Sequence, residues 1–197
     1  MVIQALKYTL LTLAAMLCSG GVCAASWTLD PGQSTLNFIS IKNTGVAETH
    51  RFTELSGSIG EQGEVNVAIA LASVDTLIQI RDQRMRELLF NTATFPQATL
   101  TAAVEADVLK ALAEGETVSM EVPVTLALHG EEKSLRVPVV ASRQDDSLRV
   151  LSARPVVVNA ADFGLTGGIA ALQKIAGLQS IATAVPVTIN LVFALDS

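Results

Sequence analysis

The sequence predicts an all-β protein, namely an antiparallel barrel of about eight strands with two short helical insertions. Two stretches lead to this fold class: residues 117–129 and 185–195 alternate apolar side chains with mostly polar ones. A period of two places one set of side chains on each face of a strand, and one-sided strands are typical of antiparallel sheets. Closing such a sheet into a barrel removes both of its free edges.

The first part of the chain predicts three further strands. Residues 27–41 alternate around an Asp-Pro-Gly turn at 30–32, which interrupts the pattern. Residues 50–59 and 65–71 are separated by a tight polar turn and should pair as a hairpin.

The next segment changes from strand to helix. In residues 80–90, Met85, Leu88 and Leu89 recur at helical spacing, and charged residues fall between them. This pattern predicts a short amphipathic helix that ends before Pro96.

The second half of the chain returns to strands. Beyond the two stretches named above, strands are expected at residues 98–104, 135–139 and 148–158. Residues 107–116 contain a glycine and no long apolar stripe, so we expect a connection there. Residues 169–176 predict a second short helix, with Gly177 as its C-terminal cap.

The N-terminal residues resemble a secretory signal. Residues 1–24 combine Lys7, an apolar run over 8–17 and small residues before a cleavage site after Ala24 or Ala25. The apolar run is too short to span a bilayer comfortably. We therefore expect an exported protein with one domain, residues 25–197.

Both cysteines, Cys18 and Cys23, lie in the segment to be removed, so we expect no disulfide and no thiolate chemistry in the mature chain. Lipidation at either is disfavoured, because leucine and valine precede them where glycine or alanine is usual.

Charge and motifs narrow the function classes. Without Lys7 the chain has 12 Lys and Arg against 19 Asp and Glu, which disfavours nucleic acid as a partner. The sequence contains no G-x-S-x-G, H-E-x-x-H, phosphate-loop or G-x-G-x-x-G motif. With two histidines, a zinc site would have to recruit carboxylates. We expect neither a catalytic site nor a metal site, although a lipid hydrolase or isomerase remains an open hypothesis.

One cluster of arginines has two interpretations. Arg81, Arg84 and Arg86 can form a solvated helix face balanced by Asp82 and Glu87. Alternatively, one guanidinium lies at the mouth of the barrel and binds an anionic or polar head group.

An ordered set of motifs resembles the YceI-like proteins, a family described as lipid- or polyisoprenoid-binding. The resemblance covers residues 27–195 and is carried by residues 29–30, 34–38, 52–57, 73–76, 81–90, 95–96, 126–130 and 159–165. It implies an extended, lipocalin-like antiparallel barrel in the periplasm, with a long isoprenoid or other lipid tail inside. One departure is that the family often has a histidine in its first strand region, where this chain has residues 39–43 and a later His50.

We therefore expect an exported, non-enzymatic protein that sequesters or carries an isoprenoid-type lipid or quinone, with no other cofactor. Residues expected to contact the tail are Phe38, Leu77, Ile80, Met85, Leu88, Leu89, Met120, Leu126, Phe163, Leu165, Ile169 and Leu172. Residues expected at the head group are Arg81, His129 and Asn159. The alternative is an interaction protein whose barrel is filled by its own side chains. A homodimer and a transient contact with a membrane or a membrane protein stay open.

Overall fold

The computed structural model describes residues 26–113 and 115–196. The predicted signal peptide, residues 1–24, lies outside the described residues. The elements follow one another as β1 (Trp27–Leu29), β2 (Thr35–Lys42), β3 (Val46–Phe52), β4 (Leu55–Ile59), β5 (Glu64–Ala70), η1 (Leu71–Ser73), β6 (Val74–Asp75), α1 (Gln79–Arg84), η2 (Met85–Leu89), β7 (Gln97–Ala103), α2 (Ala106–Ala113), β8 (Thr117–Leu128), β9 (Glu131–Gln144), β10 (Ser147–Ser152), β11 (Val156–Asn159), η3 (Ala160–Phe163), α3 (Thr166–Ala176) and β12 (Ala184–Leu195).

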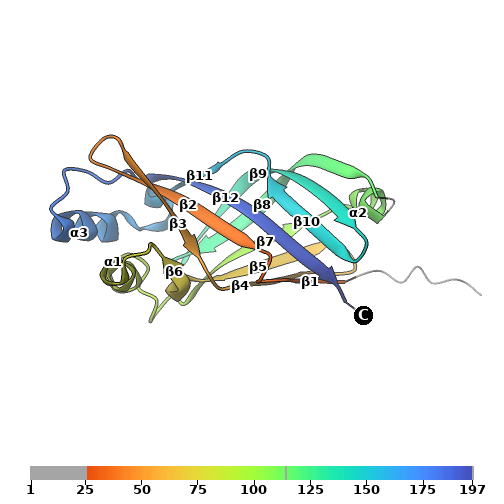
Figure 1. Cartoon of the computed structure of the whole chain (residues 1–197), viewed down its shortest axis with the longest axis horizontal. Helices are drawn as coiled ribbons and strands as arrows, with labels where there is room; N and C mark the ends of the chain where they lie inside the picture. The colour runs from red at the N-terminus through yellow and green to blue at the C-terminus, as the bar shows by residue number, and fades with distance from the viewer. Residues whose placement is uncertain (1–25, 114, 197) are drawn as a thin grey trace, which may run out of the picture.

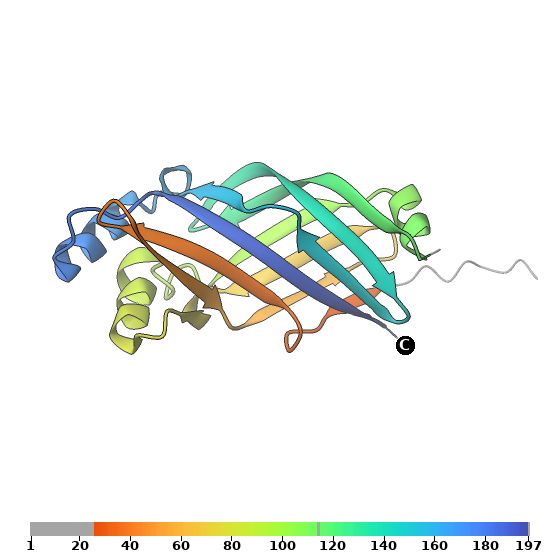
Figure 2. The same cartoon turned by 45° about the horizontal axis from the view of Figure 1, so that its top comes forward.

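The strands form one antiparallel sheet that closes on itself, as Figures 1 and 2 show. The closed ring runs β1-β4-β5-β7-β8-β9-β10-β12, and the pairing of β12 with β1 completes it. These eight strands confirm the predicted antiparallel barrel.

Strand β12 links the ring to its extension. Its C-terminal half pairs with β10 and β1, whereas its N-terminal half pairs with β11 and β2. Strands β2 and β3 form a long hairpin that continues the wall beyond the ring. The barrel is therefore longer on the side where α1 and α3 lie (Figure 1).

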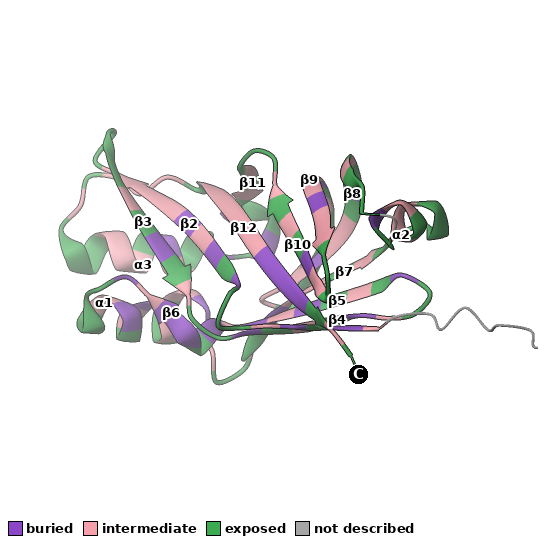
Figure 3. Cartoon of the chain, turned by 45° about the vertical axis from the view of Figure 1, so that its right-hand side comes forward, coloured by how far each residue is buried: buried purple, intermediate pink, exposed green. Residues whose placement is uncertain are grey.

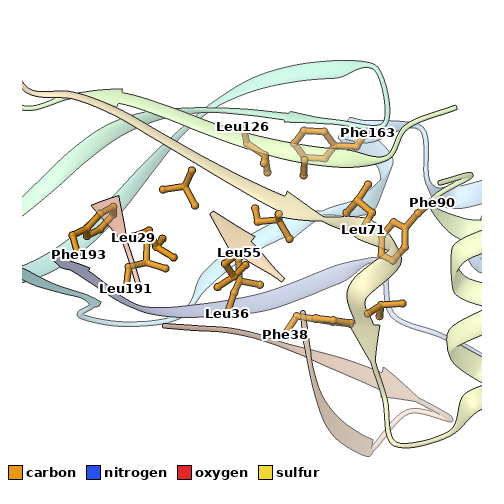
Figure 4. Close-up of a cluster of buried hydrophobic side chains, with 14 of the residues drawn as sticks. Leu29, Leu36, Phe38, Leu55, Leu71, Phe90, Leu126, Phe163, Leu191 and Phe193 are labelled. Atoms are coloured by element: carbon orange, nitrogen blue, oxygen red, sulfur yellow. The ribbon is translucent and has the colours of Figure 1, made fainter. Parts of the chain in front are cut away.

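The alternation in the sequence corresponds to inward and outward positions on the strands. Val122 and Leu126 of β8 are buried, and their neighbours Glu121 and Thr125 are more exposed. Figure 4 shows side chains from several strands pointing into one interior, among them Leu29, Leu36, Leu126 and Phe193. Figure 3 shows buried residues interspersed with more exposed ones along the strands.

The described part of the chain contains three short α-helices, one more than the sequence analysis predicted. Residues 107–116, expected to be a connection, contain α2, which covers the end of the barrel opposite α1 and α3 (Figure 1). Leu112 is buried there, and Val108 packs against the same core. A helix of two turns shows too few apolar positions for its stripe to stand out in the sequence.

The other two helical segments lie where they were expected. Helix α1 continues into η2, and α3 ends at Gly177, whose φ of 62° makes it a left-handed cap. Among the described residues, no helix has both the length and the apolar content needed to cross a bilayer.

Candidate functional site

The half of the barrel next to α1 and α3 encloses a cavity of about 510 Å³. Its wall is largely aliphatic and comes from the inner faces of the strands and from the helices. Wall residues from the strands include Leu36, Phe38, Ile69, Ala98, Leu126, Val137, Val185, Val187 and Ile189. An eight-stranded barrel leaves room for one small ligand, and ligand cavities commonly measure about 300–1,000 Å³.

The hairpin β2–β3 makes the wall change from apolar to charged along its length. Moving outward on β2, the wall residues are Leu36, Phe38, Ser40 and Lys42, and on β3 they are Phe52, His50 and Glu48. The register pairs Leu36 with Phe52, Phe38 with His50 and Ser40 with Glu48. The cavity therefore has an apolar interior and a polar outer end.

The opening of the cavity is marked by wall residues that are also exposed. Ile78, Ile80 and Ala176 meet both criteria, and Lys42 and Arg84 beside them are half-buried. We call these five residues the mouth. It lies between α1, α3 and the β2–β3 hairpin, at one end of the molecule (Figure 1).

A network of charged side chains supports one side of the mouth. Glu48 accepts from the Lys42 ammonium at 2.9 Å and from the Arg81 guanidinium at 2.7 Å. The bond from Lys42 is the main reason that the pKa of Glu48 is lowered, and Arg81 adds to it. Glu48 thus remains ionised and holds two cations beside the cavity.

Arg81 and Asp82 fix the start of α1. The Arg81 guanidinium donates to the Thr76 hydroxyl at 2.8 Å and to the Thr76 carbonyl at 2.7 Å. Buried Asp82 accepts from the amide and the hydroxyl of the same threonine. Most of the bonding capacity of Arg81 is therefore used within the protein.

Arg84 is the cation of the mouth that is left free. Within residues 26–113 and 115–196 it has no hydrogen bond or ion pair, although it lines the cavity. A ligand oxygen at the mouth could therefore accept from Arg84 without displacing a protein partner.

His50 lies just below this network and is 5% exposed. Its Nε2 lies 2.8 Å from the Ser40 hydroxyl, and its buried Nδ1 has no partner in the described structure. Burial is the main reason that the pKa of His50 is lowered, and the charge of Arg81 lowers it further. The imidazole is therefore neutral at neutral pH.

Segment η2 is a π-helical turn, and this geometry decides which of its side chains line the cavity. The amide of Phe90 donates to the carbonyl of Met85 at 2.9 Å, five residues earlier. Residues five apart lie over one another in such a turn. Met85, Leu89 and Phe90 consequently line the cavity, whereas Leu88 is 40% exposed.

Helix α3 approaches η2 closely because residue 168 is glycine. A Cβ on Gly168 would lie 2.5 Å from the Leu88 carbonyl oxygen and 2.7 Å from the Leu89 Cα, which no side chain could accept. This contact sets α3 beside η2 and brings Ile169 and Leu172 to the wall.

Eight of the predicted tail residues lie on the cavity wall: Phe38, Ile80, Met85, Leu89, Leu126, Leu165, Ile169 and Leu172. Four lie elsewhere. Leu77 is 86% exposed, Leu88 also faces outward, and Phe163 is 1% exposed within the core. Met120 lines a separate, smaller cavity.

Of the three predicted head-group residues, the structure places Arg81 on the wall. The His129 ring packs on Phe95, with 4.5 Å between the ring centres. Asn159 accepts from the amide of Ala161 and thereby caps η3. Neither side chain lines the cavity.

The sequence analysis did not assign Lys42, Glu48 or His50 to the site, and it considered Arg84 as one of three arginines of which one was expected at the mouth. The alternation of residues 36–42 provided a signal, because it places Lys42 on the same face as Phe38. The pairing of this strand with β3, which brings Glu48 and His50 opposite, depends on a register that the sequence does not state.

The smaller cavity has a volume of about 110 Å³ and lies at the α2 end of the barrel. Its wall is apolar except for Thr101, and Val108, Leu109 and Leu112 of α2 contribute to it. Leu100, Val137 and Ile189 line both cavities. The interior of the barrel thus continues from the main cavity into the smaller one, and side chains, not backbone, separate the two cavities.

Comparisons with known proteins agree with this architecture. A family model described as the YceI-like domain matches residues 27–193. A polyisoprenoid binding domain from Saccharophagus degradans, implicated in plant cell wall breakdown, is 40% identical and has a TM-score of 0.83; the match covers 86% of this chain and 98% of that one.

More distant structures share the fold. Burkholderia cenocepacia BcnA is 15% identical with a TM-score of 0.62, over 83% of this chain and 98% of that one. The Campylobacter jejuni YCEI protein is 18% identical with a TM-score of 0.50, over 75% and 84% of the two chains. No match was found among the curated proteins. The match of the family model over nearly all described residues shows that this chain belongs to the YceI-like family.

Proposed function

We propose that this protein is a non-enzymatic lipid-binding protein that carries or sequesters one long-chain isoprenoid-type lipid or quinone, with the tail in the main cavity. The observation that carries the proposal is a 510 Å³ cavity with an aliphatic interior and a charged mouth. An amphiphile has the same division between tail and head group. The 40% identity with a polyisoprenoid binding domain supports this class of ligand.

The energetics favour a flexible tail. Each buried methylene contributes about 0.8 kcal/mol, and a drug-sized ligand gains about 0.3 kcal/mol per heavy atom. A long prenyl chain can therefore reach nanomolar affinity through its tail alone. Aromatic residues make up 4% of the chain, so the wall suits a branched aliphatic chain better than a flat ring.

The head group would lie at the mouth, beside Arg84 and Lys42. Arg84 can donate to a phosphate, a carbonyl or a hydroxyl oxygen, since each of these accepts hydrogen bonds. A phosphate would gain more than a quinone from the positive charge. Comparing prenyl phosphate with a quinone of equal tail length therefore distinguishes the two head-group classes.

The Ser40–His50 pair is the nearest approach to a catalytic arrangement in the cavity. Its histidine lacks a hydrogen-bond partner at Nδ1 among the described residues, and its pKa is lowered, which weakens it as a base. These properties favour a role in binding over nucleophilic catalysis. We expect Ser40→Ala to change the affinity for the lipid. Neither this variant nor the original protein should convert the lipid chemically.

The N-terminal signal pattern favours export, and the family resemblance favours the periplasm as the destination. Fractionation of the native cells with an antibody against the protein tests this location. Recovery of the full-length chain from the cytoplasm would contradict it.

Native mass spectrometry of the protein purified gently from its own cells tests the binding function. We expect a stoichiometric adduct whose mass, after denaturing extraction, is that of a prenyl lipid or quinone. A consistently bare protein that also fails to take up added prenyl lipids would contradict the proposal. The interaction-protein alternative would then become the better account, although its filled barrel differs from the cavity described above.

A further inference from the structure

Exposed aliphatic side chains gather around the mouth. Of the large hydrophobic residues exposed in the described structure, six belong to the β2–β3 turn, α1 and its preceding turn, η2 or α3: Val46, Leu77, Ile78, Ile80, Leu88 and Ile175. The other two, Leu151 and Val157, lie on β10 and β11. In Figure 3 the tip of the β2–β3 hairpin and much of α3 have the colour of exposed residues. An apolar patch of this kind marks an interaction surface.

Leu77 is the most exposed of these residues and has an unfavourable backbone conformation. Its φ is 62°, in the left-handed region that favours glycine, and its side chain is 86% exposed. The Leu77 amide donates to the Asp75 carboxylate at 3.0 Å, which fixes the turn. A leucine side chain this exposed is little packed against the described residues, which points to a contact outside the chain.

The charges around the mouth differ from those of the rest of the molecule. Residues 40–51, 75–90 and 166–181 together contain six Lys and Arg and four Asp and Glu, whereas the whole chain contains 13 and 19. Arg84 and Lys174 have no hydrogen bond or ion pair in the described part of the chain, and Arg86 donates to the backbone carbonyl of Ala72. The mouth end is thus locally positive on an acidic protein.

We propose that this end of the barrel docks on the surface of a bilayer that contains anionic lipids. The docking face consists of Leu77, Leu88 and Ile175, which would enter the interfacial region, and Arg86 and Lys174, which would meet the lipid head groups. Docking would let the tail pass between bilayer and cavity without crossing water. The inference rests on the proposed function for its purpose, and on the exposure and the charges of these residues for the choice of the face.

Continuity between the face and the cavity favours a bilayer over a protein partner. Ile78 and Ile80 belong to the cavity wall and to the exposed surface at once, so apolar surface runs unbroken from inside to outside. A bilayer has anionic head groups on its surface and hydrocarbon below, which matches the charged residues and the apolar surface at the mouth. A protein partner would require none of this continuity.

Flotation with vesicles tests the proposal. The purified protein should float with vesicles of phosphatidylcholine and phosphatidylglycerol, and float several-fold less with phosphatidylcholine alone or at high salt. The variant Leu77→Ser/Leu88→Ser/Ile175→Ser should reduce flotation at least tenfold. The matched control, Leu151→Ser/Val157→Ser, should float like the original protein. None of these five residues lines either cavity.

A second variant and a second measurement separate this proposal from the binding function. Arg86→Gln/Lys174→Gln should lower flotation several-fold on the anionic vesicles without altering the core. Uptake of a soluble short-chain prenyl lipid in the absence of vesicles should be the same in all variants. If the original protein failed to take up that lipid, the proposed binding function would be contradicted. The flotation result would still test the docking face, because flotation does not require lipid uptake.

Three outcomes would overturn the docking face: no flotation of the original protein, equal loss in the matched control, or loss of prenyl uptake together with flotation in the triple-serine variant. The proposal would also be wrong if this surface bound a protein partner and the original protein did not float with vesicles.

Discussion

The two ends of the barrel are built from the same alternating strands but differ in how they are closed. At the α2 end, Leu112 is buried over the barrel, and Phe193 lies with it on the wall of the smaller cavity. At the other end, the β2–β3 hairpin extends the wall, and α1 and α3 leave a charged mouth open. The difference indicates that one end provides stability and the other provides access to the interior.

The largest effect expected from this comparison is on stability. Phe193 is 1% exposed, and Phe193→Ala should lower the free energy of unfolding by about 3–5 kcal/mol. Phe193 borders only the smaller cavity of about 110 Å³, whereas Phe38 faces the main cavity of about 510 Å³ and so loses fewer packing contacts when its ring is removed; Phe38→Ala should cost about 2 kcal/mol. Urea unfolding of the ligand-free proteins measures both values. Equal losses would remove the distinction between the two ends.

The second prediction concerns space in the main cavity. Ala98 of β7 lies on the wall, and Ala98→Phe should fill part of the cavity and weaken prenyl binding at least tenfold, or about 1.4 kcal/mol. Ala103→Phe is the matched control, because Ala103 is exposed on the same strand. Isothermal titration with a prenyl lipid compares the two. Unchanged affinity in Ala98→Phe would place the tail outside this cavity.

These two predictions depend on inward and outward positions, which the sequence indicated through its alternation. The apolar positions of residues 117–129 do face inward, and the hairpin of residues 55–59 with 65–69 and the two longer helical segments could be predicted. The predicted strand 50–59 was wrong in one respect, because residues 50–52 belong to β3 and pair with β2. Local patterns were sufficient for these features, because each lies within one strand, one hairpin or one helix. The barrel was predicted by a different argument, namely that closing the sheet removes its two free edges.

The charged mouth was less accessible to sequence reasoning. Arg81 was singled out from its cluster, but Lys42, Glu48 and His50 come together through the register of β2 with β3 and through the packing of α1. The sequence analysis assumed α-helical spacing around Leu88, but this segment forms a π-helical turn. Leu88 was therefore expected on the wall, whereas the structure places Phe90 there. Contacts between segments decided both features.

The third prediction concerns the strained turn at the mouth. Glycine adopts the backbone conformation of Leu77 without steric cost, so Leu77→Gly should raise the free energy of unfolding by up to about 1 kcal/mol. The control is Val157→Gly, which removes an exposed side chain from a strand and should destabilise the protein. Leu29→Gly would be unsuitable, because Leu29 is buried. Thermal unfolding distinguishes these results. Destabilisation by Leu77→Gly would mean that the side chain has an intramolecular role.

The smallest effect expected is on the pH dependence of stability. Burial lowers the pKa of His50 below its ordinary value of 6.5, Arg81 and Lys42 lower it as well, and Glu48 and Asp82 oppose them. The unfolded chain therefore binds a proton at a higher pH than the folded chain does. The contribution of His50 to stability is complete above about pH 6.5 and is lost as pH falls toward the folded pKa.

Thermal unfolding at a series of pH values measures this contribution. The original protein should lose stability as the pH falls below about 6.5, and His50→Gln should lose less over the same interval. His129→Gln is the control for removal of a histidine outside the cavity. The lowered pKa values of Glu48 and Asp75 act at more acidic pH, so their effect falls in a separate window. Identical curves for His50→Gln and the original protein would contradict the prediction.

The position of the tail is the central claim, and the methionines offer a direct measurement of it. Beyond the predicted signal peptide the chain has two, Met85 on the wall of the main cavity and Met120 in the smaller one. NMR of methyl-labelled methionine during titration with prenyl lipids of increasing length should show a saturable shift of Met85 with every lipid. Met120 should respond to the longer chains, which reach past Leu100 and Val137. Saturable binding that left both methyl signals unchanged would show that the lipid does not enter the barrel.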